Sequence, residues 1–231
     1  MTPKIIVSYD DTANDHDALA LGRVFAAAGA SVALAYVRHF PTPDPRRDEV
    51  EAHKAQALLD RGAEIIGVPD AERHVVINAS TGDGLHELAE REDADLVVLG
   101  SEYRTARGAV QPGTSAQRLL RGGRVAVALA PAGLRSREDV TVGRIGVLAG
   151  VEDAASEQTA HSLADVLGAT VAVEGDEKVD LLIVGSRPEA PSGLLTLSAA
   201  AEYAIDTSTC PVLMVPRGTP VRFGTRALSA A

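Results

Sequence analysis

Short apolar runs alternate along the chain with longer stretches in which apolar residues recur at helical spacing. In the first 133 residues the apolar runs predict five strands, at Lys4–Tyr9, Ser31–Val37, His74–Asn78, Asp95–Gly100 and Val125–Leu129. The stretches between them predict four helices, over residues 15–28, 46–66, 84–92 and 114–121. Strands that are almost wholly apolar and are separated by helices are typical of a parallel sheet buried on both faces. The pattern therefore predicts an α/β fold.

Part of this pattern occurs twice along the chain. Three segments of the first half recur in the second half: Gly29–Val32 as Gly168–Val171, Asp95–Ser101 as Asp180–Ser186, and Pro131–Gly133 as Pro216–Gly218. The first pair is separated by 139 residues and the other two by 85, so the second copy lacks 54 residues. We therefore expect a complete domain over residues 1–133, a polar linker over 134–141, and a reduced, four-stranded copy over 142–218 that lacks helix 2, strand 3 and helix 3.

Composition and charge exclude several classes of function. Apolar residues make up 45% of the chain but aromatic residues only 3%, so the interior must be built mainly from Ala, Val, Leu and Ile. The 22 Lys and Arg residues against 32 Asp and Glu residues give a net charge of −10, which opposes binding to nucleic acid or to an anionic membrane. Cys210 is the only cysteine, which excludes an intramolecular disulfide and a thiolate metal cluster. The six histidines lack metal-ligand spacing, so no metal site is expected.

The N-terminal region predicts the location of the protein. No apolar run approaches the roughly 20 residues of a membrane span. Met1–Lys4 leads directly into a predicted strand and does not have the pattern of a signal peptide. We therefore expect a cytoplasmic protein without membrane or nucleic-acid partners.

Polar and small residues follow two of the predicted strands. Asp10 follows the first strand, and Gly100 ends the fourth, whose loop runs to Gly113, Thr114 and Ser115 at the start of a helix. Ligands of open parallel sheets bind beyond the carboxyl ends of the strands. Glycine lets backbone N–H groups approach an anion closely, and a helix N-terminus offers unpaired donors. A structural alternative stays open for each feature, because Asp10 and the Gly113–Ser115 segment can also act as helix caps.

These residues resemble the universal stress protein family. That family carries the phosphate-binding pattern Gly-x2-Gly-x9-Gly-Ser/Thr after its fourth strand and an Asp after its first. Here the four positions of the pattern are Gly100, Tyr103, Gly113 and Thr114, so three of the four match at the family's spacing. The chain is identified as a tandem member of the family with a truncated second domain. The resemblance implies a Rossmann-like, doubly wound parallel sheet, a pseudo-dimer of the two copies, and ATP or a related adenine nucleotide as the ligand.

Departures from the family pattern limit the implied site to the first copy. Tyr103 replaces the second glycine, and its ring either blocks the site or swings aside to cover a ligand. The second copy keeps only Gly185 of the pattern, and Gly150 stands where the first copy has Asp10. In binding members of the family, the backbone at the position of Val37 contacts adenine. The implied nucleotide-binding residues are therefore Asp10, Val37, Gly100, Tyr103, Gly113, Thr114 and Ser115.

The sequence leaves two functions open. The first is a regulatory or binding protein of the stress response that binds an adenine nucleotide in its first domain only, with a homodimer as a further assembly. The alternative is a nucleotide-independent interaction or scaffold module with a vestigial cleft. The commonest hydrolase and nucleoside-triphosphatase motifs do not occur. An enzyme is not expected, although weak ATP hydrolysis through Asp10, Asp11 or Glu102 stays open.

Overall fold

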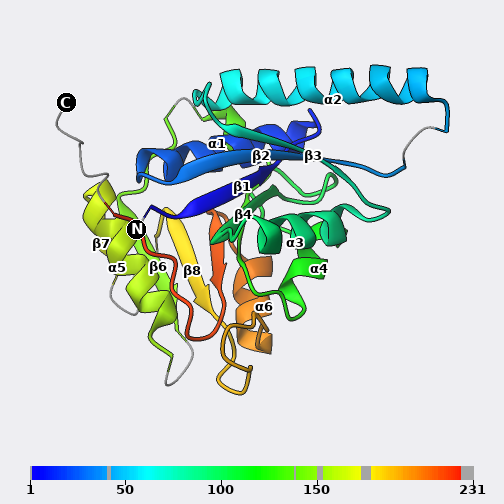
Figure 1. Ribbon diagram of the computed structural model, residues 1–231. Coiled ribbons are helices and arrows are strands. Elements are labelled where there is room, and N and C mark those ends of the chain that lie inside the picture. The colour runs from blue at the N-terminus through cyan, green and yellow to red at the C-terminus, as the bar shows by residue number, and fades with distance from the viewer. Residues whose placement is uncertain (1, 41–42, 138, 150–152, 173–177, 225–231) are drawn as a thin grey trace, which may run out of the picture.

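The computed structural model describes residues 2–40, 43–137, 139–149, 153–172 and 178–224 (Figure 1). The first half of the chain forms five strands, β1 (Lys4–Ser8), β2 (Ser31–Arg38), β3 (Glu72–Ile77), β4 (Leu96–Gly100) and β5 (Ala126–Ala130). The helices between them are α1 (Ala13–Ala27), α2 (Pro45–Ile66), α3 (Thr81–Arg91) and α4 (Thr114–Leu120). All four pairings among these strands are parallel, as the apolar pattern predicts.

The second half contributes fewer elements. They are β6 (Arg144–Leu148), α5 (Ala155–Leu167), β7 (Thr170–Val171), β8 (Leu181–Gly185), α6 (Ala199–Asp206) and β9 (Val212–Val215). The described strands form one sheet in the order β3-β2-β1-β4-β5-β9-β8-β6-β7. The order β9-β8-β6-β7 repeats β5-β4-β1-β2, and the described part of the second half has no strand in the place of β3. Antiparallel pairing of β5 with β9 joins the two halves, with Ala128 opposite Leu213.

Helices cover both faces of this sheet because successive strand residues point to opposite sides. In β1, Ile5 and Val7 are buried with residues of α1, α2 and α5, whereas Ile6 is buried with residues of α3, α4 and α6. Figure 1 shows α1 and α2 on one side of the first-half strands and α3 and α4 on the other. Each fully buried aliphatic side chain of this kind stabilises the fold by about 1.5–3 kcal/mol. The sheet is therefore doubly wound, in agreement with the predicted fold class.

The loops after β4 and β8 repeat the same backbone geometry. Gly108 N donates to Ala132 O, and Gly193 N donates to Arg217 O, each over 2.7 Å. Both glycines have a positive φ, 89° and 78°, which favours glycine. A serine begins each loop in the same way, since Ser101 Oγ donates to Ala130 O and Ser186 Oγ donates to Val215 O. Residues 85 positions apart in the sequence therefore form equivalent hydrogen bonds in the two halves. The domain limits 1–133 and 142–218 stay a prediction.

The segment predicted as a linker is held against the first half. Its first residues form a 3₁₀ turn, Leu134–Ser136, in which Leu134 is buried. The fully buried carboxylate of Asp17 accepts hydrogen bonds from Gly133 N at 2.8 Å, from Arg135 N at 2.7 Å and from Arg135 Nη1 at 2.7 Å. A buried charge needs such partners. The start of this predicted linker is therefore fixed to the first half by buried hydrogen bonds.

The chain after β9 also returns to the first half. Val221 and Phe223 are buried in the same core as α1, and the ring of Phe223 stacks on that of Phe25 with centroids 5.7 Å apart. This contact lies beyond the predicted end of the second copy at residue 218. It ties the last described residues of the chain to α1. No helix in the described part of the chain is both long enough and apolar enough to cross a membrane.

Candidate functional site

A cleft of about 380 Å³ opens at the carboxyl ends of β1 and β4. These strands are neighbours in the sheet, and their connections leave in opposite directions, α1 toward β2 and α4 toward β5. Such a reversal is where open α/β sheets bind ligands. Six of the seven predicted residues line the cleft, namely Asp10, Gly100, Tyr103, Gly113, Thr114 and Ser115.

Val37 is the predicted residue that does not line the cleft. Its side chain is buried in β2 beneath α3, where a Cβ on Gly84 would lie 3.0 Å from Val37 Cγ1. Packing thus accounts for the apolar side chain at this position. A backbone contact between Val37 and a base stays a prediction.

Gly100 is required by packing as well as by the loop. A Cβ on Gly100 would lie 2.1 Å from the carbonyl oxygen of Asn14, in the first turn of α1. The side chain of Asn14 also donates from Nδ2 to Ser101 O over 2.7 Å. The first glycine of the pattern therefore allows α1 to lie directly on the end of β4, whether or not a ligand is bound.

The structure tests the alternative that residues of the Gly113–Ser115 segment cap α4 with their side chains. Gly113 is the N-cap residue, and no side-chain hydrogen bond caps the helix. A Cβ on Gly113 would meet nothing closer than 3.8 Å. The segment therefore supplies the N-cap residue Gly113, as the alternative allows, but the Thr114 and Ser115 side chains do not cap the helix, and both residues line the cleft.

Asp10 does not cap α1 either. Thr12 is the N-cap, and it forms a reciprocal capping box with Asp15. Asp10 N donates to Asp15 Oδ2 over 3.2 Å, and the exposed carboxylate of Asp10 accepts from Thr12 N over 3.3 Å. Burial of the Asp15 carboxyl, followed by the adjacent carboxyl of Asp10, raises the pKa of Asp15 to about 7. Asp10 and Asp15 thus form an acidic pair at one wall of the cleft.

Asp11 holds this turn in an unusual backbone conformation. Its φ is 67°, a value that is uncommon outside glycine. Its carboxylate accepts from the buried Tyr9 hydroxyl at 2.8 Å, contacts His16 Nε2 at 3.1 Å and pairs with Arg61 Nη2 at 3.4 Å. These contacts, led by the Tyr9 hydroxyl, lower the pKa of Asp11. Asp11 therefore anchors the turn, while Asp10 lines the cleft.

Several lining residues were not predicted from the sequence. They are Ser8, Thr12, Asn14, Asp15, Thr81, Leu99, Ser101 and Ala116. Glu102, which the sequence offered only as a carboxylate for weak ATP hydrolysis, lines the cleft as well. Thr12 and Asp15 carry a recognisable signal, because Ser/Thr-x-x-Asp/Glu before an apolar run is a capping-box motif. Thr81 has no such signal, since it reaches the cleft only because α3 begins beside the end of β1.

Tyr103 does not fill the cleft. Its side chain is 70% exposed, and the guanidinium of Arg104 lies 4.9 Å from the centre of its ring. The ring is thus exposed to solvent at the edge of the cleft, while its role toward a ligand stays a prediction. Substitution of the second glycine therefore leaves the cleft open.

The charged side chains that line the cleft are all acidic. They are Asp10, Asp15 and Glu102, and no Lys or Arg side chain is among the described lining residues. Glu102 Oε2 accepts a hydrogen bond from the backbone N–H of Arg104 over 2.7 Å. The cleft therefore combines hydroxyl groups and backbone donors with an excess of negative charge.

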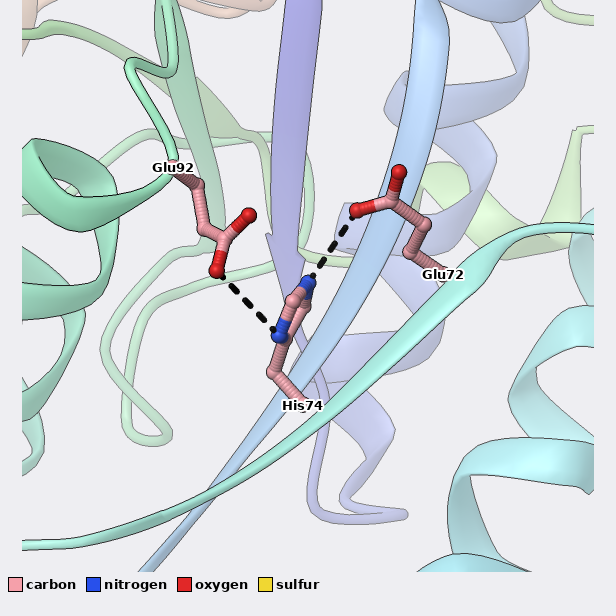
Figure 2. Close-up of side chains that lie close together, drawn as sticks. All are labelled: Glu72, His74 and Glu92. Carbon is pink, nitrogen blue, oxygen red and sulfur yellow. Dashed lines mark ion pairs between the residues drawn. The ribbon is translucent and has the colours of Figure 1, made fainter.

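A second cluster of titratable groups lies at the opposite end of the strands (Figure 2). Glu72, His74 and Glu92 bring potential metal-ligating atoms within 4.8 Å of one another, and Figure 2 shows the His74 ring between the two carboxylates. The ammonium group of Lys4 bonds to Glu72 at 2.7 Å and to Glu92 at 2.9 Å. These bonds lower the pKa of both glutamates. The cluster is thus an ion-pair network in which Lys4 supplies the cation, and it joins β1, β3 and the end of α3.

Comparison with known proteins agrees with this fold. Residues 1–131 match the model of the universal stress protein family. A universal stress protein of Mycobacterium tuberculosis is 33% identical over 121 residues, which are 47% of this chain and 40% of that protein. This chain thus matches about two fifths of the length of its curated relatives.

A solved structure of the family shows the same architecture over most of the chain. A universal stress protein from Archaeoglobus fulgidus superposes with a TM-score of 0.69 at 14% identity, covering 93% of this chain and 98% of the other. A universal stress protein solved in complex with cAMP is 25% identical, with a TM-score of 0.34, and covers 42% of this chain and 71% of its own. The first likeness extends over both halves of the sheet and concerns the fold alone.

Proposed function

The chain belongs to the universal stress protein family, and we propose that it is a regulatory binding protein of the stress response whose first-half cleft binds an adenine nucleotide or a closely related adenine compound. One observation carries this proposal. Residues that lie about 90 positions apart in the sequence, Asp10 on one side and Gly100 to Ser115 on the other, line one cleft at the reversal point of the sheet. We propose a binding function rather than catalysis.

The groups at the cleft suit the parts of such a ligand. The exposed carboxylate of Asp10 is an acceptor for ribose hydroxyl groups. Thr114 and Ser115 offer hydroxyl donors, and the first turn of α4 offers backbone N–H groups without a side-chain cap. The Tyr103 ring is exposed to solvent and does not fill the cleft. These features support one ligand orientation, with the ribose near Asp10 and the opposite end near α4.

The described part of the second copy offers no equivalent site. Ser198 occupies the position of Gly113 at the offset of 85, and its own Oγ accepts from Ala201 N over 3.2 Å to cap α6. The first turn of α6 thus has part of its backbone N–H groups satisfied by a side-chain cap, whereas the first turn of α4 has no such cap. Gly150, the counterpart of Asp10, lies outside the described residues. We therefore propose one site per chain, with the two halves arranged as a pseudo-dimer through β5 and β9.

Calorimetric titration of adenosine, AMP and ATP into the purified protein tests the function. We expect saturable binding of at least one adenine compound with a stoichiometry of one per chain. Asp10→Ala should weaken that binding at least about tenfold, equivalent to roughly 1.4 kcal/mol. Asp70→Ala is the matched control, because Asp70 is an exposed loop carboxylate away from the cleft. Lack of binding by all three compounds at millimolar concentration would refute the proposal. ATP hydrolysis that is lost in Asp10→Ala would instead revive an enzymatic function.

One observation favours the alternative, a nucleotide-independent interaction module. A groove of about 640 Å³, larger than the cleft, lies between α4 and α6 and is lined by Leu120, Leu197 and Ile205 together with Glu202 and Asp206. It lies between one helix from each half of the chain. If no adenine compound binds, this groove becomes the first surface to examine for a protein partner by mutation.

A further inference from the structure

Glu102 places a carboxylate inside the loop between β4 and α4. Its Cβ and Cγ lie 3.8 and 3.9 Å from the position that a Cβ on Gly113 would take, so the side chain runs beside the start of α4. Its Oε2 accepts the backbone N–H of Arg104 over 2.7 Å. A carboxylate bonded to a backbone N–H makes the same kind of charge-assisted bond as a phosphate oxygen. Glu102 therefore holds its negative charge within the loop, beside the start of α4, through a bond to a backbone donor of the same loop.

The basic side chains near the loop do not offset this charge. The guanidinium of Arg104 lies over the ring of Tyr103, at 4.9 Å from its centre. The Arg107 side chain packs on Gly133, where a Cβ would lie 2.9 Å from Arg107 Cγ. Arg118 pairs with Asp83. No Lys or Arg is among the described residues that line the cleft, so a polyphosphate there would face the Glu102 carboxylate without a lining cation to offset it, and like charges in a partly buried site repel more strongly than in water.

The fold does not require an acid at this position. Arg187 occupies it in the second copy, at the offset of 85. The two backbones are hydrogen-bonded alike, since Glu102 N donates to Gln111 O over 2.9 Å and Arg187 N donates to Thr196 O over 2.8 Å. The loop thus accepts either charge, and the carboxylate of Glu102 affects the cleft rather than the fold.

From these contacts we propose that Glu102 determines the ligand class of the cleft by excluding the phosphate end, so that an uncharged adenine nucleoside binds in preference to a nucleoside polyphosphate. The inference rests on the proposed function, because it concerns the same cleft. The negative charge of Glu102 does not oppose the proposed role of Asp10 at the other wall, because Asp10 accepts hydrogen bonds from ribose hydroxyl groups, which are uncharged.

The test compares adenosine with ATP in calorimetric titrations of the whole chain, in EDTA and again in Mg²⁺. The wild-type protein should bind adenosine at least about tenfold more tightly than ATP in both buffers. Glu102→Gln should tighten ATP binding about tenfold, equal to roughly 1.4 kcal/mol, and change adenosine binding by less than about twofold. Glu102→Arg, which copies the second half, should tighten ATP binding further. Glu64→Gln removes the same charge from the exposed face of α2 and should change neither affinity.

Two results would overturn the inference while leaving the adenine site intact. One is wild-type protein that binds ATP more tightly than adenosine in either buffer. The other is an ATP affinity that stays the same in Glu102→Gln and Glu102→Arg. Failure of the proposed function is a different result, in which neither compound binds the wild type or either variant. Circular dichroism spectra like those of the wild type would show that the variants are folded.

Discussion

Replacement of the two motif glycines, Gly100 and Gly113, by alanine separates packing from ligand binding. A methyl group at residue 100 would lie 2.1 Å from the carbonyl oxygen of Asn14, far inside the roughly 3.5 Å that such a contact needs. That oxygen belongs to the backbone of α1, so no side-chain rotation can relieve the clash. Overpacking of this kind costs about 1–3 kcal/mol.

A shift of α1 would also weaken the hydrogen bond of 2.7 Å from Asn14 Nδ2 to Ser101 O, which adds about 1 kcal/mol. We therefore expect Gly100→Ala to reduce the free energy of unfolding by about 3 kcal/mol. Gly113→Ala is the matched comparison, because its methyl group would have no neighbour within 3.8 Å and the residue has an ordinary φ of −74°. Its unfolding free energy should stay within about 1 kcal/mol of the wild-type value.

Urea unfolding followed by circular dichroism measures both variants. The midpoint should fall clearly for Gly100→Ala at an unchanged denaturant slope, since the same surface is exposed on unfolding. Equal losses of stability in the two variants, or a Gly100→Ala protein as stable as the wild type, would refute the packing argument. In that case the first glycine of the motif would have to be explained by ligand binding alone.

Four further predictions concern the buried charge, the acidic pair, the second half and Tyr103. Asp17→Ala should lower the unfolding free energy by at least about 2 kcal/mol, because it removes the acceptor of two backbone N–H groups and one of the two acceptors of Arg135 Nη1; a urea midpoint close to that of the wild type would contradict this. The folded-state pKa of Asp15, about 7, lies above its ordinary value of 3.8, so folding binds a proton and stability should fall as the pH rises from about 4 to 7, by at most about 4 kcal/mol. Asp15→Asn should flatten this dependence of stability on pH. If urea unfolding at several pH values shows that the wild-type stability is as independent of pH as that of Asp15→Asn, the link between Asp15 protonation and folding is refuted. Deletion of residues 142–231 should expose the edge of β5 that β9 covers and give dimers or aggregates in size-exclusion chromatography with light scattering; a stable monomer of equal solubility would show that the second half has no role as a cover. Tyr103→Gly should change the affinity for an adenine ligand by less than about twofold, because the ring is already turned outward, whereas strong binding gained by this variant in calorimetry would show that the ring blocks the site in solution.

The apolar pattern predicted where most elements lie but not where every helix begins. Strands and helices of the first half start and end within three residues of the predicted positions. The largest difference is α3, which begins at Thr81 rather than Gly84 because Ser80 caps it, with Ser80 Oγ accepting from Asp83 N over 3.2 Å. Capping residues are polar, so apolar periodicity cannot locate them, whereas the buried face of a helix is visible in the sequence.

Six of the seven predicted cleft residues line the cleft because parallel strands end at one edge of the sheet. Asp10 lies just beyond the end of β1 and Gly100 is the last residue of β4, and neighbouring parallel strands bring such residues to the same edge of the sheet. The acidic character of the site could not be predicted in the same way. The sequence offers Glu102 as a carboxylate near the cleft, but only the structure shows that it accepts a hydrogen bond from Arg104 N and runs beside Gly113.

The sequence by itself determined the fold class, the repeat and the segments that face the cleft, because apolar periodicity and constant offsets are properties of the chain order. The tertiary structure decided how the two halves meet, through antiparallel β5 and β9, and how Phe223 returns to Phe25. It also decided that Gly100 serves packing and that Tyr103 turns outward. These features depend on distances between atoms that lie far apart in the chain, and such distances are set only when the buried faces of all the elements pack together.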